Sequence, residues 1–199
     1  MDYEAARPRP EVRRIHAEAY VRMALLGASD ISRATRREHA IEAARLGSSI
    51  AVAARFSELA SLFMSDGRDQ DKLIEFTEQA IGLGMRFQRT SPASFFGRSP
   101  RQALAFLETA NRIAAVLLSR PSPRGLAVMD RLVQLAEAVL VQAGRRRVTL
   151  GGKAGADLLR QFESLVGAAS EAGVRWTPGD ETRSILASFA TKSPRREAS

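Results

Sequence analysis

The stretch SPRQALAFLETANRIAAVLLS, residues 99–119, decides the fold class. Serine followed by proline is a typical helix start, because the serine oxygen accepts a free backbone N–H and proline needs no partner at the first position. Small and apolar residues then recur every three or four positions, at Ala103, Leu107, Ala110, Ala114 and Leu117. This spacing places them on one side of an α-helix, so the stretch predicts an amphipathic helix packed against a core.

The same pattern recurs along the chain in both directions. Ser122 and Pro123 repeat the start signal, Pro10 opens the first helical run, and Ser29 or Asp30 is expected to cap the second. Helical runs are expected near residues 10–26, 31–46, 50–63, 73–83, 99–117, 122–140 and 158–169, with a short last helix near 181–190. Short connections favour antiparallel neighbours. The sequence therefore predicts an all-α fold of about seven helices in antiparallel pairs, either a bundle or a short solenoid.

Length and composition favour a single helical domain over residues 1–191, followed by a polar tail over residues 192–199. Apolar residues make up 45% of the 199 residues, which is enough to form a packed core. The chain has no cysteine, no N-terminal apolar run and no apolar stretch of the roughly 20 residues that span a membrane. We therefore expect a cytoplasmic protein without a membrane partner.

The net charge of +8 is confined to the middle of the chain. Residues 86–160 hold 13 basic and 4 acidic residues, whereas residues 1–85 hold 12 and 13, and residues 161–199 hold 5 and 5. All but three of the basic residues are arginines, which suit bidentate contacts with phosphate and carboxylate groups. A GC-rich genome produces the same enrichment, so an ordinary solvated surface is the alternative.

The basic residues of this middle segment lie mostly at helix connections. If consecutive helices are antiparallel, alternate connections meet at the same end of the fold, and a helix N-terminus beginning near Ser99 would add its own attraction for anions. We call this predicted surface the basic pole, and expect it to contact nucleic acid, an acidic protein or another anion. Its members are Arg86, Arg89, Arg98, Arg101, Arg145, Arg146, Arg147 and Lys153.

Two segments, residues 67–80 and 97–110, align without gaps and repeat Gly, Arg, Phe, Glu and Ala in register. Residues 53–83 also carry aromatic and small residues at the positions where paired helices pack closely, namely Phe56, Leu59, Ala60 and Phe63. This stretch resembles a tetratricopeptide repeat. The resemblance implies tetratricopeptide-like pairs of helices, whereas a generic helical bundle is the alternative.

Candidate catalytic groups are few and do not form a recognised motif. The two histidines lack metal-binding spacing, and the glycine-rich residues 151–155 lack the full phosphate-binding pattern. Arg33 and His39, separated by five residues, are similar to the Arg-to-His motif of certain helical ribonucleases. Acidic residues on the expected helices are interpreted as solvated charges without partners, namely Glu38, Glu42, Asp130, Glu137 and Glu163. We therefore expect no enzyme activity, no metal site and no cofactor.

The function favoured by the sequence is a non-enzymatic helical interaction or regulatory protein that binds a protein or peptide partner, with a homodimer left open. The alternative is a DNA-binding transcriptional regulator, because residues 43–59 have the spacing of a helix-turn-helix. Its recognition helix, residues 50–59, is mostly apolar and offers Arg55 as its one basic side chain. Base edges are contacted by several polar side chains, so the pattern favours a core helix.

Overall fold

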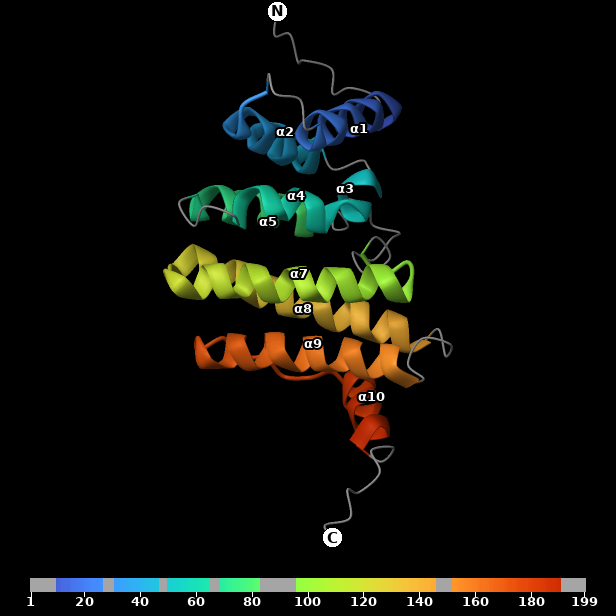
Figure 1. Ribbon diagram of the computed structural model, residues 1–199. Helices are drawn as coiled ribbons and strands as arrows, with labels where there is room; N and C mark the ends of the chain where they lie inside the picture. The colour runs from blue at the N-terminus through green and yellow to red at the C-terminus, as the bar shows by residue number, and fades with distance from the viewer. Residues whose placement is uncertain are drawn as a thin grey trace, which may run out of the picture. The chain divides into compact units, whose positions relative to one another are not determined.

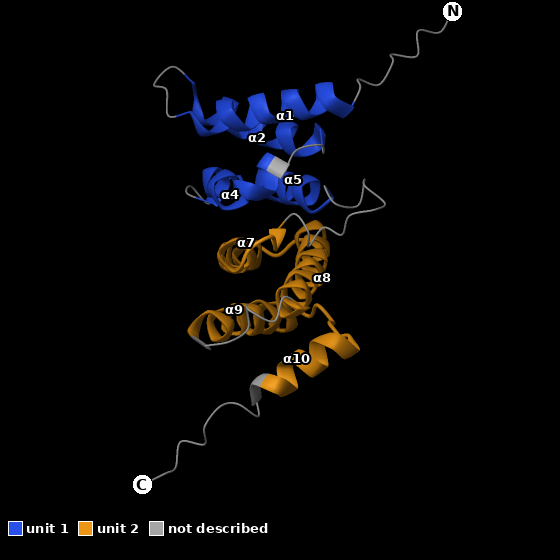
Figure 2. Ribbon diagram, turned by 90° about the vertical axis from the view of Figure 1, so that its right-hand side faces the viewer, with its two compact units in different colours: residues 1–95 blue, residues 96–199 orange. Residues whose placement is uncertain are grey.

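The computed structural model describes residues 10–26, 31–46, 50–64, 69–82, 96–145 and 152–190. Across these ranges the regular structure is helical and no strand occurs, so the all-α prediction is confirmed (Figure 1). The chain divides into two compact units, residues 1–95 and residues 96–199 (Figure 2). The single domain expected over residues 1–191 stays a prediction, and the tail over residues 192–199 lies outside the described residues.

Unit 1 contains α1 (Pro10–Leu25), α2 (Arg33–Leu46), α3 (Ile50–Ala54), α4 (Phe56–Met64) and α5 (Gln70–Ile81). α1 packs along α2, and α5 packs against both α2 and α4. The run expected over residues 50–63 is divided at Arg55 into α3 and α4. The division is slight, because Arg55 N still donates to Ala51 O (3.0 Å) and Arg55 O still accepts from Leu59 N (2.9 Å).

The start of α2 differs from the expected cap. Ser32 precedes the helix, and its hydroxyl accepts a hydrogen bond from Thr35 N at 3.1 Å. A serine oxygen in this position satisfies one of the first N–H groups of a helix, which have no partner within the helix. The expected caps, Ser29 and Asp30, lie outside the described residues.

The core of unit 1 is built on three stacked phenylalanines. The ring of Phe76, on α5, lies 5.8 Å from the ring of Phe56 and 5.1 Å from that of Phe63, both on α4. All three are at most 2% exposed, so each contributes its full apolar area to the core. The residues that carry the tetratricopeptide resemblance therefore lie in this core, and the repeat itself stays a prediction.

Unit 2 contains α7 (Pro100–Ser119), α8 (Pro123–Arg145), α9 (Gly152–Glu171) and α10 (Asp180–Ala190). The long helices α7, α8 and α9 pack against one another, and α10 packs against α8. The start of α7, the end of α8 and the start of α9 lie at the same end of the unit (Figure 1). Consecutive long helices of unit 2 are therefore antiparallel, as their short connections predict.

Both long helices that follow a Ser-Pro pair begin as expected. Ser99 accepts a hydrogen bond from Gln102 N at 3.2 Å, and Ser122 accepts one from Gly125 N at 3.0 Å. Farther along α7, the Asn111 side chain donates to the backbone oxygen of Gln161 on α9 at 2.7 Å. This bond ties α7 to α9, two helices that are not consecutive.

Candidate binding site

A single carboxylate anchors the segment that joins α9 to α10. Glu137, on α8, accepts hydrogen bonds from Trp176 Nε1 (3.0 Å), Gly179 N (2.8 Å) and Thr182 Oγ1 (2.7 Å). Burial raises the pKa of Glu137, but the hydrogen bonds from Thr182, Gly179 and Trp176 favour the charged form and lower the pKa overall. The carboxylate therefore holds one end of the joining segment against α8.

The other end of this segment is fixed by the way α9 ends. Gly173 has a φ of 81°, a left-handed conformation that glycine adopts at low cost. This turn lets Val174 N donate to Ala169 O at 2.9 Å, which satisfies one of the last carbonyls of α9. Residues 174–179 are therefore held between two fixed points, the end of α9 and Glu137.

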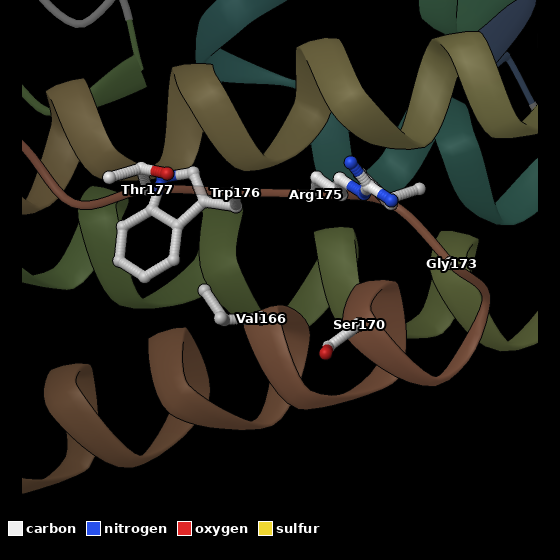
Figure 3. Close-up of a pocket in the computed structure, with 7 residues that line it drawn as sticks. Val166, Ser170, Gly173, Arg175, Trp176 and Thr177 are labelled. Atoms are coloured by element: carbon white, nitrogen blue, oxygen red, sulfur yellow. The ribbon is translucent and has the colours of Figure 1, made fainter.

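An open pocket of about 580 Å³ lies between α9 and this segment (Figure 3). Its wall is the half-buried indole of Trp176, which makes an edge contact with the ring of Phe162 at 5.4 Å. The remaining lining residues come from the last turns of α9 and from the segment itself, namely Val166, Ser170, Gly173, Val174, Arg175 and Thr177. The pocket thus combines an aromatic wall and valines with two hydroxyls and one guanidinium.

Arg175 is the charged group of the pocket. Its side chain is exposed, and it makes no hydrogen bond or ion pair with any residue in the part of the chain that the structure describes. A guanidinium in this state is available to a carboxylate or phosphate from outside. The chain's single tryptophan was the one signal in the sequence that could have directed attention to this segment.

The basic pole is described in part. Arg98, Arg101 and Lys153 are exposed beside the starts of α7 and α9, and Arg145 is exposed at the end of α8, all at one end of unit 2 (Figure 1). The remaining members, Arg86, Arg89, Arg146 and Arg147, lie outside the described residues. Anion binding at this pole stays a prediction.

Arg145 already has a partner within unit 2. Its Nε and one terminal nitrogen each donate to the carboxylate of Glu181, on α10, at 2.7 Å. These bonds raise the pKa of Arg145 and lower that of Glu181. An anion approaching the basic pole would have to compete with Glu181 for this guanidinium, whereas Lys153 has no ion pair among the residues described.

The outward side of α1 carries an exposed apolar stripe. Ile15 is 60% exposed and Val12 is 39% exposed, while Leu26, directly after the helix, is 52% exposed. The opposite side of α1 supplies the buried residues Ala17, Val21 and Ala24. A helix with apolar residues on two opposite sides is typical of a helix that packs against a neighbour on each side. The exposed side of α1 is therefore a candidate docking surface.

The helical acids were interpreted as lacking partners, and this is wrong for all of them except Glu163, although Glu38 remains exposed to solvent. Glu137 has the contacts described above, Glu38 pairs with Lys72 Nζ at 2.8 Å, and Glu42 pairs with Arg45 at 3.2 Å. Asp130 accepts a hydrogen bond from Gln134 at 2.9 Å. The spacing of one helix does not identify partners on another, so the anchoring role of Glu137 was not visible in the sequence.

The supposed recognition helix packs into the core of unit 1. Its apolar residues Val52, Ala53, Phe56 and Leu59 are all buried. Arg55, the one basic residue it offered, pairs with Glu58 at 2.6 Å. Residues 50–59 therefore present few polar side chains that could contact the edges of DNA bases.

The Arg-to-His pair is also engaged within unit 1. Arg33 Nε donates to the backbone oxygen of Leu62 at 3.3 Å. The ring of His39 lies 5.5 Å from the ring of Tyr20. Both side chains therefore contribute to packing between α2 and its neighbours.

No family model, no curated protein and no solved structure matches the chain. Within the described ranges, no helix is both long and apolar enough to cross a membrane.

Proposed function

We propose that this is a non-enzymatic helical interaction protein that binds a protein partner through the outward side of α1. The observation that carries the proposal is the exposure of Ile15 and Val12 on the side of α1 that faces away from its own unit. Burying an isoleucine that is 60% exposed is worth about 1–2 kcal/mol, so a stripe of such residues favours association.

The occupant that fits this surface is a second copy of the chain. Glu11 and Arg22 lie beside the stripe, near opposite ends of α1. Neither side chain makes an ion pair with any described residue. When two α1 helices pack antiparallel about an axis near residue 16, Glu11 of each copy lies beside Arg22 of the other. The surface is thus self-complementary, which a two-fold interface requires.

Sedimentation equilibrium of the full chain tests this proposal. We expect a monomer–dimer equilibrium, and we expect Ile15→Glu to abolish dimer formation. An interface centred near residue 16 would bury the introduced carboxylate of both copies. Ala115→Glu, at an exposed position on α7, introduces the same charge elsewhere and should leave the equilibrium unchanged. A wild-type chain that stays monomeric at high concentration would exclude the second copy as the occupant.

The charge pattern allows a sharper test of the antiparallel arrangement. Glu11→Arg places this arginine beside Arg22 of the other copy, so the like charges should weaken the dimer. Adding Arg22→Glu restores opposite charges at both symmetry-related contacts between positions 11 and 22, so the double variant should dimerise again. Failure of the double variant to recover association would exclude this register even if the chain dimerises.

As a second candidate function, we propose that the basic pole contacts nucleic acid or another anion. The observation that favours it is the position of Arg98, Arg101 and Lys153 beside two helix N-termini at one end of unit 2. Fluorescence polarisation with labelled duplex DNA and RNA across a salt series tests this. We expect affinity to fall steeply with salt, and to fall uniformly for all sequences when the three residues become alanine. Binding that is absent at low salt would exclude it.

A further inference from the structure

The segment beside the pocket has the pattern of a β-strand that lacks a neighbour. Residues 174–177 run as an extended trace along α9 (Figure 3). Their exposure alternates, since Val174 and Trp176 are half-buried while Arg175 and Thr177 are exposed. This is the period of two that a strand shows when one face is packed and the other faces solvent.

The backbone of this segment also has free hydrogen-bonding groups. Val174 N is bonded to Ala169 O, but the peptide groups of Arg175, Trp176 and Thr177 make no hydrogen bond to any residue that the structure describes. Such a row of unpaired N–H and C=O groups is a ready template for another extended chain.

From these observations we propose that the Trp176 pocket binds an extended, acidic peptide segment of a partner protein, which adds to residues 175–177 as a strand. Backbone hydrogen bonds supply the affinity in this mode, and the side chains at alternate positions supply the specificity. One apolar side chain of the peptide packs against Trp176 and Val166, and an acidic side chain pairs with Arg175. The pocket shares no lining residue with the α1 surface or with the basic pole.

The geometry favours a strand over a helix as the occupant. A paired strand lies about 4.8 Å from its neighbour and satisfies the free peptide groups directly. A helix is about 10 Å wide and has bonded its own peptide groups internally, so it would leave those of residues 175–177 without partners. The pocket wall therefore accommodates a side chain of the bound peptide, while the edge of the segment receives its backbone.

The charge favours an acidic peptide. Residues 96–199 hold 16 Lys and Arg against 9 Asp and Glu, a net charge of +7. The one charged group that lines the pocket is the unpaired guanidinium of Arg175. An acidic peptide is thus attracted at long range by unit 2 and paired at short range by this residue.

The segment is already held in the shape that binding needs. Glu137 fixes one end through the Trp176 indole, Gly179 and Thr182, and the left-handed turn at Gly173 fixes the other. A template fixed at both ends loses little conformational freedom when a peptide binds.

Peptide selection on the full-length protein tests the proposal. Short random peptides displayed on phage are selected on the wild-type chain, and those that also bind Arg175→Glu are removed. We expect the remaining sequences to alternate acidic and apolar residues. Enrichment of no sequence, or of basic or helix-forming sequences alone, would overturn the proposal.

Trp176 then reports binding of the synthesised peptide directly, because it is the only tryptophan in the chain. We expect a saturable change in its emission, with a dissociation constant about tenfold higher for Arg175→Glu. Arg112→Glu, an exposed arginine on α7 with no partner among the described residues, makes the same charge change and should bind as the wild type does.

A second probe tests the strand itself. The same peptide with its alternate backbone nitrogens methylated keeps every side chain but loses the N–H groups that pair with the template. We expect its affinity to fall by at least about tenfold, the loss that corresponds to 1.4 kcal/mol. Equal binding of the methylated and unmethylated peptides would show that the side chains alone are recognised, and would overturn strand addition.

Discussion

Arg37 in unit 1 and Glu137 in unit 2 stabilise helix ends with opposite charges. Arg37, on α2, donates from Nε to the backbone oxygen of Leu62 at 2.8 Å, in the last turn of α4, and pairs with Asp69. Glu137, on α8, accepts from Gly179 N at 2.8 Å and from Thr182 Oγ1 at 2.7 Å, at the start of α10. Each side chain reaches a helix other than its own.

The sign of each charge follows from the helix end that it meets. The last carbonyls of a helix have no partner within it and carry partial negative charge, so a guanidinium is stabilising there. The first N–H groups carry partial positive charge, so a carboxylate is stabilising there. The neighbours of Arg37 follow the same rule, since Arg33 also reaches Leu62 O and Arg36 Nε donates to Ala24 O, near the end of α1, at 2.7 Å.

The largest loss of stability is expected when Arg37 is replaced. This side chain is 6% exposed, and its guanidinium lies 5.8 Å from the centre of the Phe63 ring, so it also fills space in the core. Arg37→Ala should lower the free energy of unfolding by about 3 kcal/mol, because it removes a buried charge together with its packing. Chemical denaturation followed by circular dichroism measures the loss, and hydrogen exchange should locate it in α2, α4 and α5.

Arg55→Ala is the matched control for this prediction. Arg55 belongs to the same unit but is exposed, and its pair with Glu58 lies one turn along the chain. Its removal should cost less than about 0.5 kcal/mol. If the two alanine variants are equally stable, the contact between Arg37 and the end of α4 does not contribute to the stability of unit 1.

A smaller effect is expected at Glu137, which is half-buried. Glu137→Ala leaves the Trp176 indole, Gly179 N and the buried hydroxyl of Thr182 without their acceptor, and should cost about 2 kcal/mol after allowance for water replacing part of the contact. The emission of Trp176 should shift to longer wavelength as the indole gains water. Glu108→Ala, an exposed glutamate on α7, should change neither stability nor emission.

Local patterns in the sequence predicted the helices but not these contacts. The Ser-Pro starts of α7 and α8 were correct because a cap depends on residues within one turn. The partners of Arg37 and Glu137 lie 25 to 45 residues farther along the chain. Such distances depend on how helices pack, and one helix face gives no information about them. Glu137 therefore had the sequence pattern of a solvated charge, and no local pattern singled out Arg37.

Lowering the pH should weaken the contacts of Glu137 but not the contact of Arg37 with Leu62 O. The resulting loss of stability should be smaller than that caused by Arg37→Ala or by Glu137→Ala. Because the pKa of Glu137 is lower in the folded chain than its ordinary value of 4.5, its contribution to stability is fully present above about pH 4.5 and is lost as the pH falls through the lower folded value. The hydrogen bond from Arg37 Nε to Leu62 O involves no carboxylate, so this contact should persist as the pH falls.

The emission of Trp176 during thermal unfolding at pH 7 and at successively lower pH measures the contribution of Glu137. Glu181, whose pKa Arg145 lowers, titrates in the same window, so the wild type is compared with Glu137→Gln, which keeps Glu181 and removes only the titrating anchor. The stability difference between the two should narrow as the pH falls. A difference that stays constant down to pH 2 would mean that the hydrogen bonds to Glu137 do not depend on its charge. The rule that pairs each helix end with an opposite charge would then hold only for the arginines of α2.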